Sequence, residues 1–122
     1  MADIHVVFQK KAPTIVLEDP EAVMQKEPIL WRFHTAGTPV RRVRISFENR
    51  RATFFEVNGR KKAWIEKSIE NRHAIWGQAP RYFKPTDPPG SRVDKYTIKA
   101  YGAKGKLLRW ATLDPTIRTD GP

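Results

Sequence analysis

Histidine, the residue that most often binds metals and moves protons, occurs three times, as His5, His34 and His73. None has a second histidine two or four residues away, which is the spacing that would indicate a metal site. His5 and His34 lie opposite the apolar stripe of their expected strands, so their rings would meet if those strands pair. The sequence predicts no metal site, and we expect hydrogen-bonded or solvated histidines. Cysteine is absent, which excludes disulfides, thiolate ligands and cysteine nucleophiles.

The other candidates for catalysis are equally weak. Glu66 and Glu70 are four residues apart and would share one face of a helix, an arrangement that acid–base chemistry can use. Basic residues surround them, however, and this pattern is typical of surface ion pairs. The serines lack a nucleophile-elbow context, and residues 102–106 form an expected turn that is too short for a phosphate loop. The sequence therefore predicts no catalytic residue and no cofactor.

Positive charge is the strongest functional signal. The chain has a formal net charge of +10, and residues 38–84 carry twelve Lys and Arg against four Asp and Glu. The candidates for a basic binding face are Arg42, Arg44, Arg50, Arg51, Arg60, Lys61, Lys62, Arg72, Arg81 and Lys84. The aromatic residues that are candidates for stacking are Trp64, Trp76 and Tyr82. This concentration of charge predicts a positive face rather than a uniformly basic surface.

Three interpretations of this basic face stay open. Cations and exposed aromatic rings can hold phosphates and stack bases, which indicates nucleic acid. The same cations can engage an acidic protein surface. Alternatively, the aromatics belong to the core and the charges are only solvated. No known nucleic-acid module is recognisable. We take as the main hypothesis a non-enzymatic binding module for an acidic protein partner, with nucleic-acid binding as the alternative and an enzyme whose site forms only on folding as the least favoured.

The size and composition indicate one soluble domain over residues 1–122. Hydrophobic residues make up 39% of the chain, and four Trp, three Tyr and six Phe can fill a core. Ten Pro and seven Gly favour turns over long helices. No signal peptide or membrane-spanning run is visible, so we expect a cytoplasmic protein without a membrane partner. Exposed edge strands leave a homodimer open.

The elements that must position these residues are strands. Alternating apolar and polar residues predict seven strands, near residues 3–9, 14–17, 29–34, 42–48, 53–57, 96–101 and 107–113. Asn58-Gly59 is the strongest hairpin signal, and residues 21–27 fit one helical turn. Residues 61–76 fit both a helix and a strand, and we favour strand or irregular structure. The pattern predicts an all-β, antiparallel β-sandwich.

The expected core follows from the apolar side of each strand. It consists of Ile4, Val6, Phe8, Ile15, Leu17, Ile29, Trp31, Phe33, Val43, Ile45, Phe47, Phe55, Val57, Tyr96, Ile98, Leu108 and Trp110.

Short phrases in the second half resemble uncharacterised bacterial cupredoxin-like domains. They are AIWGQAP at 74–80, DKYTIKAYGAKGK at 94–106 and LDPTIRTDG at 113–121, and the strand with Trp31 and Phe33 is similar to an early cupredoxin strand. The resemblance covers about half of the chain and implies a two-sheet Greek-key sandwich, cupredoxin-like or immunoglobulin-like. Cupredoxins bind copper through two His, one Cys and usually Met. Because cysteine is absent, the resemblance implies the fold without the copper.

Overall fold

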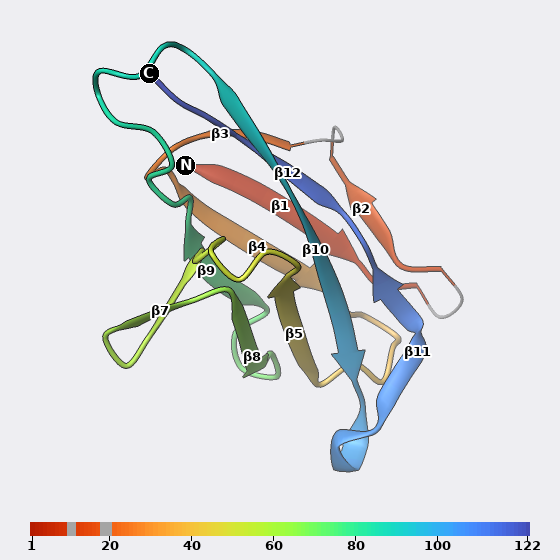
Figure 1. The fold of residues 1–122 in the computed structure, drawn as a ribbon. Helices are drawn as coiled ribbons and strands as arrows, with labels where there is room; N and C mark the ends of the chain where they lie inside the picture. The colour runs from red at the N-terminus through yellow and green to blue at the C-terminus, as the bar shows by residue number, and fades with distance from the viewer. Residues whose placement is uncertain (10–11, 18–20) are drawn as a thin grey trace.

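Strands account for almost all regular structure in this chain. The computed structural model describes residues 1–9, 12–17 and 21–122, and the elements in these ranges are twelve strands and one short 3-10 turn (Figure 1). The strands are β1 (Ala2–Val7), β2 (Thr14–Val16), β3 (Glu21–Met24), β4 (Pro28–His34), β5 (Arg42–Phe47), β6 (Phe55–Val57), β7 (Arg60–Lys62), β8 (Trp64–Ser68), β9 (Ala74–Gln78), β10 (Ser91–Tyr101), β11 (Leu107–Leu113) and β12 (Thr116–Asp120). The expectation of an all-β fold is confirmed. Within these ranges no helix is long and apolar enough to cross a membrane.

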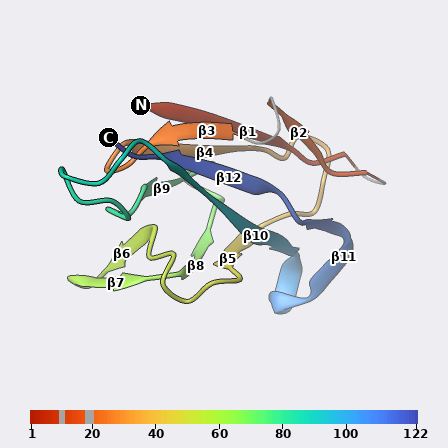
Figure 2. The same ribbon diagram turned by 45° about the horizontal axis from the view of Figure 1, so that its top comes forward.

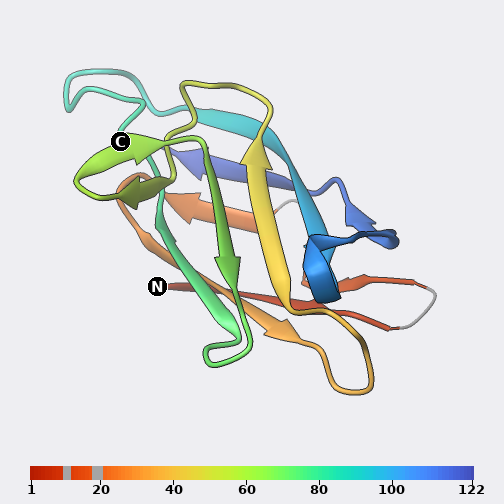
Figure 3. The same ribbon diagram turned by 90° about the horizontal axis from the view of Figure 1, so that it is seen from below.

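The strands form two large sheets and one hairpin. The first sheet has the order β2-β1-β4-β9, and the second has the order β3-β12-β10-β5-β8, with β11 paired to β10. The hairpin is β6–β7. Figure 2 shows β1, β2 and β4 in one layer, with β5, β10 and β11 in the layer below. The hairpin lies at one end of the molecule and β11 at the other, as Figure 3 shows from below.

Both large sheets are mixed, which corrects the prediction of a purely antiparallel fold. β1 runs parallel to β4, and β3 runs parallel to β12. Alternation of side chains shows which residues share a face but carries no information on strand direction. Parallel neighbours also need a crossover connection rather than a tight turn, and no local turn signal marks such a connection.

The predicted count of seven strands is also wrong, although all seven of those segments contain a strand. The five additional strands are β3, β7, β8, β9 and β12. The predicted helical turn over residues 21–27 is instead β3, because Val23 is buried where β3 pairs with β12. Residues 61–76 contain the end of β7, all of β8 and the start of β9. In β8, Ile65 pairs with Ile45, and in β9, Ile75 pairs with Trp31, so the segment spans both sheets.

An aromatic cluster joins the two layers. The Trp31 indole Nε1 on β4 donates a hydrogen bond of 3.2 Å to the Tyr96 hydroxyl on β10. The Phe47 ring stacks on Phe54 with 4.1 Å between ring centroids, and on Tyr96 with 4.8 Å. The Phe55 ring lies 5.5 Å from that of Trp31. Because all five side chains are buried, this cluster is a principal source of apolar stabilisation.

Most of the predicted core is buried, with two kinds of exception. Five predicted members are only partly buried, namely Ile15, Leu17, Val57, Leu108 and Trp110. Buried apolar residues that the prediction missed include Phe54, Ile65, Ile69, Ile75 and Ile117. Phe54 directly precedes β6 within a predicted strand segment, whereas the other four lie in or beside β8, β9 and β12, which the alternation did not reveal.

Candidate functional site

A cleft opens between the β6–β7 hairpin and the edge strand β9. We call it the Trp76 cleft, and its volume is about 570 Å³. Its lining is Lys26, Thr53, Phe54, Phe55, Glu56, Lys61, Trp76, Gly77, Gln78, Ala79, Pro80 and Arg81.

The walls of this cleft are held by backbone contacts. The Gln78 N–H donates a hydrogen bond of 2.8 Å to the Phe54 carbonyl, which ties the start of the hairpin to β9. The Gln78 side-chain Nε2 donates to the Lys26 carbonyl at 2.9 Å. Gly77 permits this close approach, since a Cβ there would lie 2.7 Å from the Trp31 ring and 3.0 Å from the Phe54 carbonyl oxygen. The floor of the cleft therefore rests directly on the core.

Trp76 presents its ring to solvent at this cleft. In β9 the side chains alternate, so Ile75 is buried while Trp76 is 55% exposed. For Trp76, no cation or aromatic ring in the described part of the chain is stacked on the indole. A large apolar ring left exposed in this way is typical of a binding surface.

The charges that line the Trp76 cleft are mostly positive. Lys26, Lys61 and Arg81 contribute three cations against one carboxylate, Glu56. None of the three cations forms an ion pair with another described residue. Lys26 occupies a left-handed turn with φ of 66° after β3. The cleft therefore favours an anionic ligand with an apolar or planar group.

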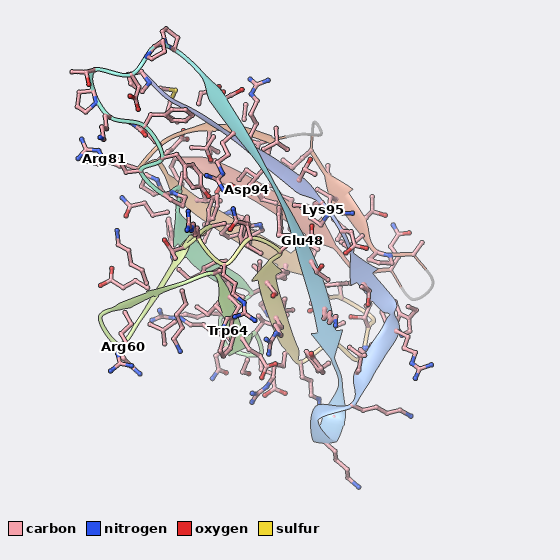
Figure 4. All side chains as sticks on the ribbon, viewed as in Figure 1. Glu48, Arg60, Trp64, Arg81, Asp94 and Lys95 are labelled. Carbon is pink, nitrogen blue, oxygen red and sulfur yellow. The ribbon has the colours of Figure 1, made fainter. Side chains whose placement is uncertain are left out.

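A second hollow lies on the other side of the hairpin. We call it the Trp64 hollow, and its lining is Arg44, Ser46, Phe47, Glu48, Arg50, Lys62, Ala63 and Trp64. The Arg44 guanidinium lies 4.5 Å from the centroid of the Trp64 ring, and the Lys62 ammonium lies 5.0 Å from it. The Trp64 ring thus already serves as a platform for two cations. Figure 4 shows Trp64 on β8 and Arg60 at the tip of the hairpin.

Tyr82, the third candidate for stacking, is engaged inside the chain. Its hydroxyl donates a hydrogen bond of 2.7 Å to Oδ2 of the buried Asp94, and the Arg92 guanidinium lies 4.4 Å from its ring centroid. Burial, reinforced by the hydrogen bond to Asp94, raises the pKa of the Tyr82 phenol well above its usual range. These contacts anchor the segment that carries Arg81, so Tyr82 has a positioning role in this structure.

The ten predicted basic residues divide among three hollows and the surface between them. Lys61 and Arg81 line the Trp76 cleft, and Arg44, Arg50 and Lys62 line the Trp64 hollow. A third hollow contains Arg42, whose side chain pairs with Glu66 at 3.2 Å. The remaining four, Arg51, Arg60, Arg72 and Lys84, are exposed. Within the described ranges, Arg42 alone among the ten has an ion-pair partner, so this surface carries a large uncompensated charge.

Sequence reasoning missed Lys26, Thr53 and Gln78 in the Trp76 cleft. Lys26 belongs to the region of lowest net charge and reaches the cleft where β4 pairs with β9, since its N–H donates a hydrogen bond of 2.8 Å to the Ala79 carbonyl just after β9. Thr53 and Gln78 are polar residues beside strands, which is too common a pattern to indicate a site. No local signal would have identified these three.

The remaining candidates are the two glutamates and the histidines. Glu70 lies near the Arg41 guanidinium at 3.6 Å, so both predicted carboxylates form surface ion pairs. The strands with His5 and His34 pair side by side, and the two rings meet, with 2.9 Å between His5 Nδ1 and His34 Nε2. No cluster of three or more metal-ligating side chains occurs among the residues that the structure places.

No protein-family model, curated protein or solved structure matches this chain. The geometry and charges of the Trp76 cleft are therefore the basis for inferring a function.

Proposed function

We propose that this protein is a non-enzymatic binding module whose Trp76 cleft holds an acidic segment of a protein partner. The observation that carries the proposal is the exposed Trp76 ring beside three cations, Lys26, Lys61 and Arg81, that lack an ion pair among the described residues. Cations of this kind speed the encounter with an acidic surface, and a tryptophan that becomes buried on binding is a frequent energetic centre of an interface.

Nucleic acid is the second candidate, and Trp76 with its neighbouring cations is the observation that favours it. A base could stack on this indole while Lys61 or Arg81 contacts the phosphate. Single-stranded binders, however, use successive aromatic platforms along a groove. Here Arg44 and Lys62 already cover part of the Trp64 ring, and Arg92 covers part of the Tyr82 ring. This is why we rank an acidic protein segment above a nucleic acid.

Fluorescence anisotropy with two labelled probes would distinguish these functions. One probe is an acidic peptide of Glu and Asp with a central Leu, and the other is oligothymidylate. We expect the peptide to bind more tightly at about 50 mM salt, and to weaken as the Debye length falls at about 500 mM. Tighter binding of oligothymidylate would favour the nucleic-acid alternative, and binding of neither probe would refute both.

Charge-reversal variants would locate the site. Lys61→Glu and Arg109→Glu change the net charge equally, but Lys61 lines the Trp76 cleft whereas Arg109 is exposed on β11 at the other end of the molecule. We expect Lys61→Glu and Trp76→Ala to abolish most peptide binding, and Arg109→Glu to retain it. Equal losses in the two charge-reversal variants would show non-specific attraction rather than a site.

We also infer that the fold is a Greek-key sandwich of the cupredoxin-like type that lacks the cysteine-containing copper site of cupredoxins. This proposal is supported by two mixed sheets around one core, and by β12, which begins directly after Asp114-Pro115. An experimental structure whose strand connections differ from those of cupredoxins would contradict it.

A further inference from the structure

Two histidine side chains meet on the outer face of the first sheet, away from the core. In the parallel register of β1 and β4, His5 lies opposite Arg32 and His34 lies opposite Val7, so the two histidines are diagonal neighbours. Their contact joins His5 Nδ1 and His34 Nε2 at 2.9 Å, with 5.2 Å between ring centroids. The backbones of both histidines belong to the paired strands β1 and β4, so the Cα positions of the two side chains are fixed relative to each other.

The separation of the two nitrogens matches that of two ligands on one metal ion. Nitrogens that each lie about 2.0–2.1 Å from a metal are roughly 2.9 Å apart when they subtend a right angle at it. In the metal-free pair one ring donates to the other, so a single proton occupies the space between them. Rotation of the rings is enough to direct both lone pairs at an ion placed beside that contact, because neither ring is enclosed by the core.

The surroundings of the pair tolerate a cation. Arg32, which lies opposite His5 in the strand register, has its guanidinium directed at Asp3, with 3.3 Å between Nε and Oδ1. β2 contributes Val16 opposite His5, an uncharged side chain. His34 also borders an open hollow whose lining includes His73. Water molecules can therefore reach the remaining coordination positions.

We propose that His5 and His34 form a binding site for a divalent late first-row transition-metal ion, with water as the other ligands. Neutral imidazole is a preferred ligand of such ions, and the Irving–Williams order places Cu²⁺ as the tightest of them. Within the described ranges no third metal-ligating side chain completes the cluster, so the site is a two-histidine chelate of modest affinity. It shares no residue with the Trp76 cleft and does not depend on the function proposed for that cleft.

A calorimetric titration with Cu²⁺, with glycine as a weak competitor, tests the site. We expect one equivalent to bind the native protein, and His5→Gln and His34→Gln each to weaken binding by about tenfold or more. His73→Gln is the matched control and should bind as the native protein does. Because His34→Gln leaves the amino terminus and His5 in place, unchanged affinity in that variant would overturn the proposal. An equal loss in His73→Gln would also overturn it, since the ion would then lie in the hollow beside His73.

A second measurement uses the unmodified protein. Substoichiometric Cu²⁺ is paramagnetic and broadens the NMR signals of nuclei near it. We expect broadening centred on residues around His5 in β1 and around His34 in β4. Broadening confined to the amino terminus, or spread evenly over the chain, would contradict the site.

Discussion

At the scale of single residues, Tyr82 shows how one buried contact couples stability to pH. Its hydroxyl donates to the buried Asp94 carboxylate, and its pKa is raised because burial disfavours the phenolate. The folded protein therefore keeps the phenolic proton at a pH where the unfolded chain releases it. This contribution to stability is complete below the usual tyrosine pKa of about 10 and is lost as the pH rises above it.

We expect Tyr82→Phe to destabilise the fold by about 1–3 kcal/mol at neutral pH, since Asp94 loses a hydrogen bond in a buried setting. The variant should also lose less stability than the native protein between about pH 9 and about pH 11. Urea unfolding over this range measures both effects. An identical decline in the two proteins would show that Tyr82 does not carry this pH dependence.

Gly77 gives a second test at this scale. We expect Gly77→Ala to cost about 1–3 kcal/mol, because the added methyl overlaps the Trp31 ring and the Phe54 carbonyl. Gly90→Ala is the matched control, since its Cβ would meet the Phe83 ring at an ordinary 3.4 Å and the Pro88 carbonyl oxygen at 3.9 Å. Thermal unfolding compares the two variants. If both change the melting temperature equally, the close approach at Gly77 is not what restricts this position.

The sequence identified part of the cleft at residue level. Trp76, Lys61 and Arg81 were all candidates because tryptophan and clustered cations are informative wherever they occur. The sequence could not rank Trp76 above Trp64, because that difference depends on where Arg44 and Lys62 place their charges. Lys26 was not identified because its position depends on the pairing of β4 with β9, two strands far apart in the chain.

At the scale of elements, the β6–β7 hairpin is the wall of the Trp76 cleft that a substitution would most easily destabilise. Among the residues that the structure describes, its two strands pair with each other and with no further strand, and Asn58 and Gly59 adopt φ of 53° and 76° at the turn. Such a two-stranded ribbon has little stability of its own. The turn residues therefore control the position of Lys61.

We expect Gly59→Ala to raise the hydrogen-exchange rates of hairpin amides, because a left-handed conformation costs a residue with a Cβ about 1–2 kcal/mol. Affinity for the acidic peptide should fall as well, while the global melting temperature changes little. Gly59→Asn is the control and should be milder, since asparagine tolerates this conformation. Unchanged exchange in Gly59→Ala would mean that contacts with β9 alone hold the hairpin.

Alternation of apolar residues revealed the longer strands because one face of each is buried. It failed for β7, which contains only charged residues, and for β3 and β12, which are short and pair in parallel with each other. Their identity as strands depends on partners distant in sequence. For the same reason, local sequence patterns could not predict the parallel pairings of β1 with β4 and of β3 with β12.

At the scale of the whole molecule, positive charge opposes folding. The net charge is +10, and several cations gather around the hairpin without ion pairs among the described residues. The surface ion pairs that do form contribute about 0–1 kcal/mol each. Repulsion among the unpaired cations should therefore outweigh the ion pairs.

We expect the melting temperature to rise between about 10 mM and about 150 mM sodium chloride, over which the Debye length falls from about 30 Å to about 8 Å. Differential scanning calorimetry measures this, with sucrose as an uncharged control solute. Lys61→Glu should reduce the salt dependence by lowering the net charge. A melting temperature that falls as salt is added would show that attractive ion pairs dominate instead.

The position of β12 has a consequence for how the protein is made. β12 lies between β3 and β10, so the second sheet has a vacant place until residues 116–120 have been synthesised. In a nascent chain that lacks residues 116–120, the edges of β3 and β10 that face β12 in the folded protein are both unpaired. Since pairing of β3 with β12 also joins segments far apart in sequence, it is slow to form. Folding of this sheet is therefore completed after β12 leaves the exit tunnel, and until then the unpaired strand edges are places where aggregation can begin.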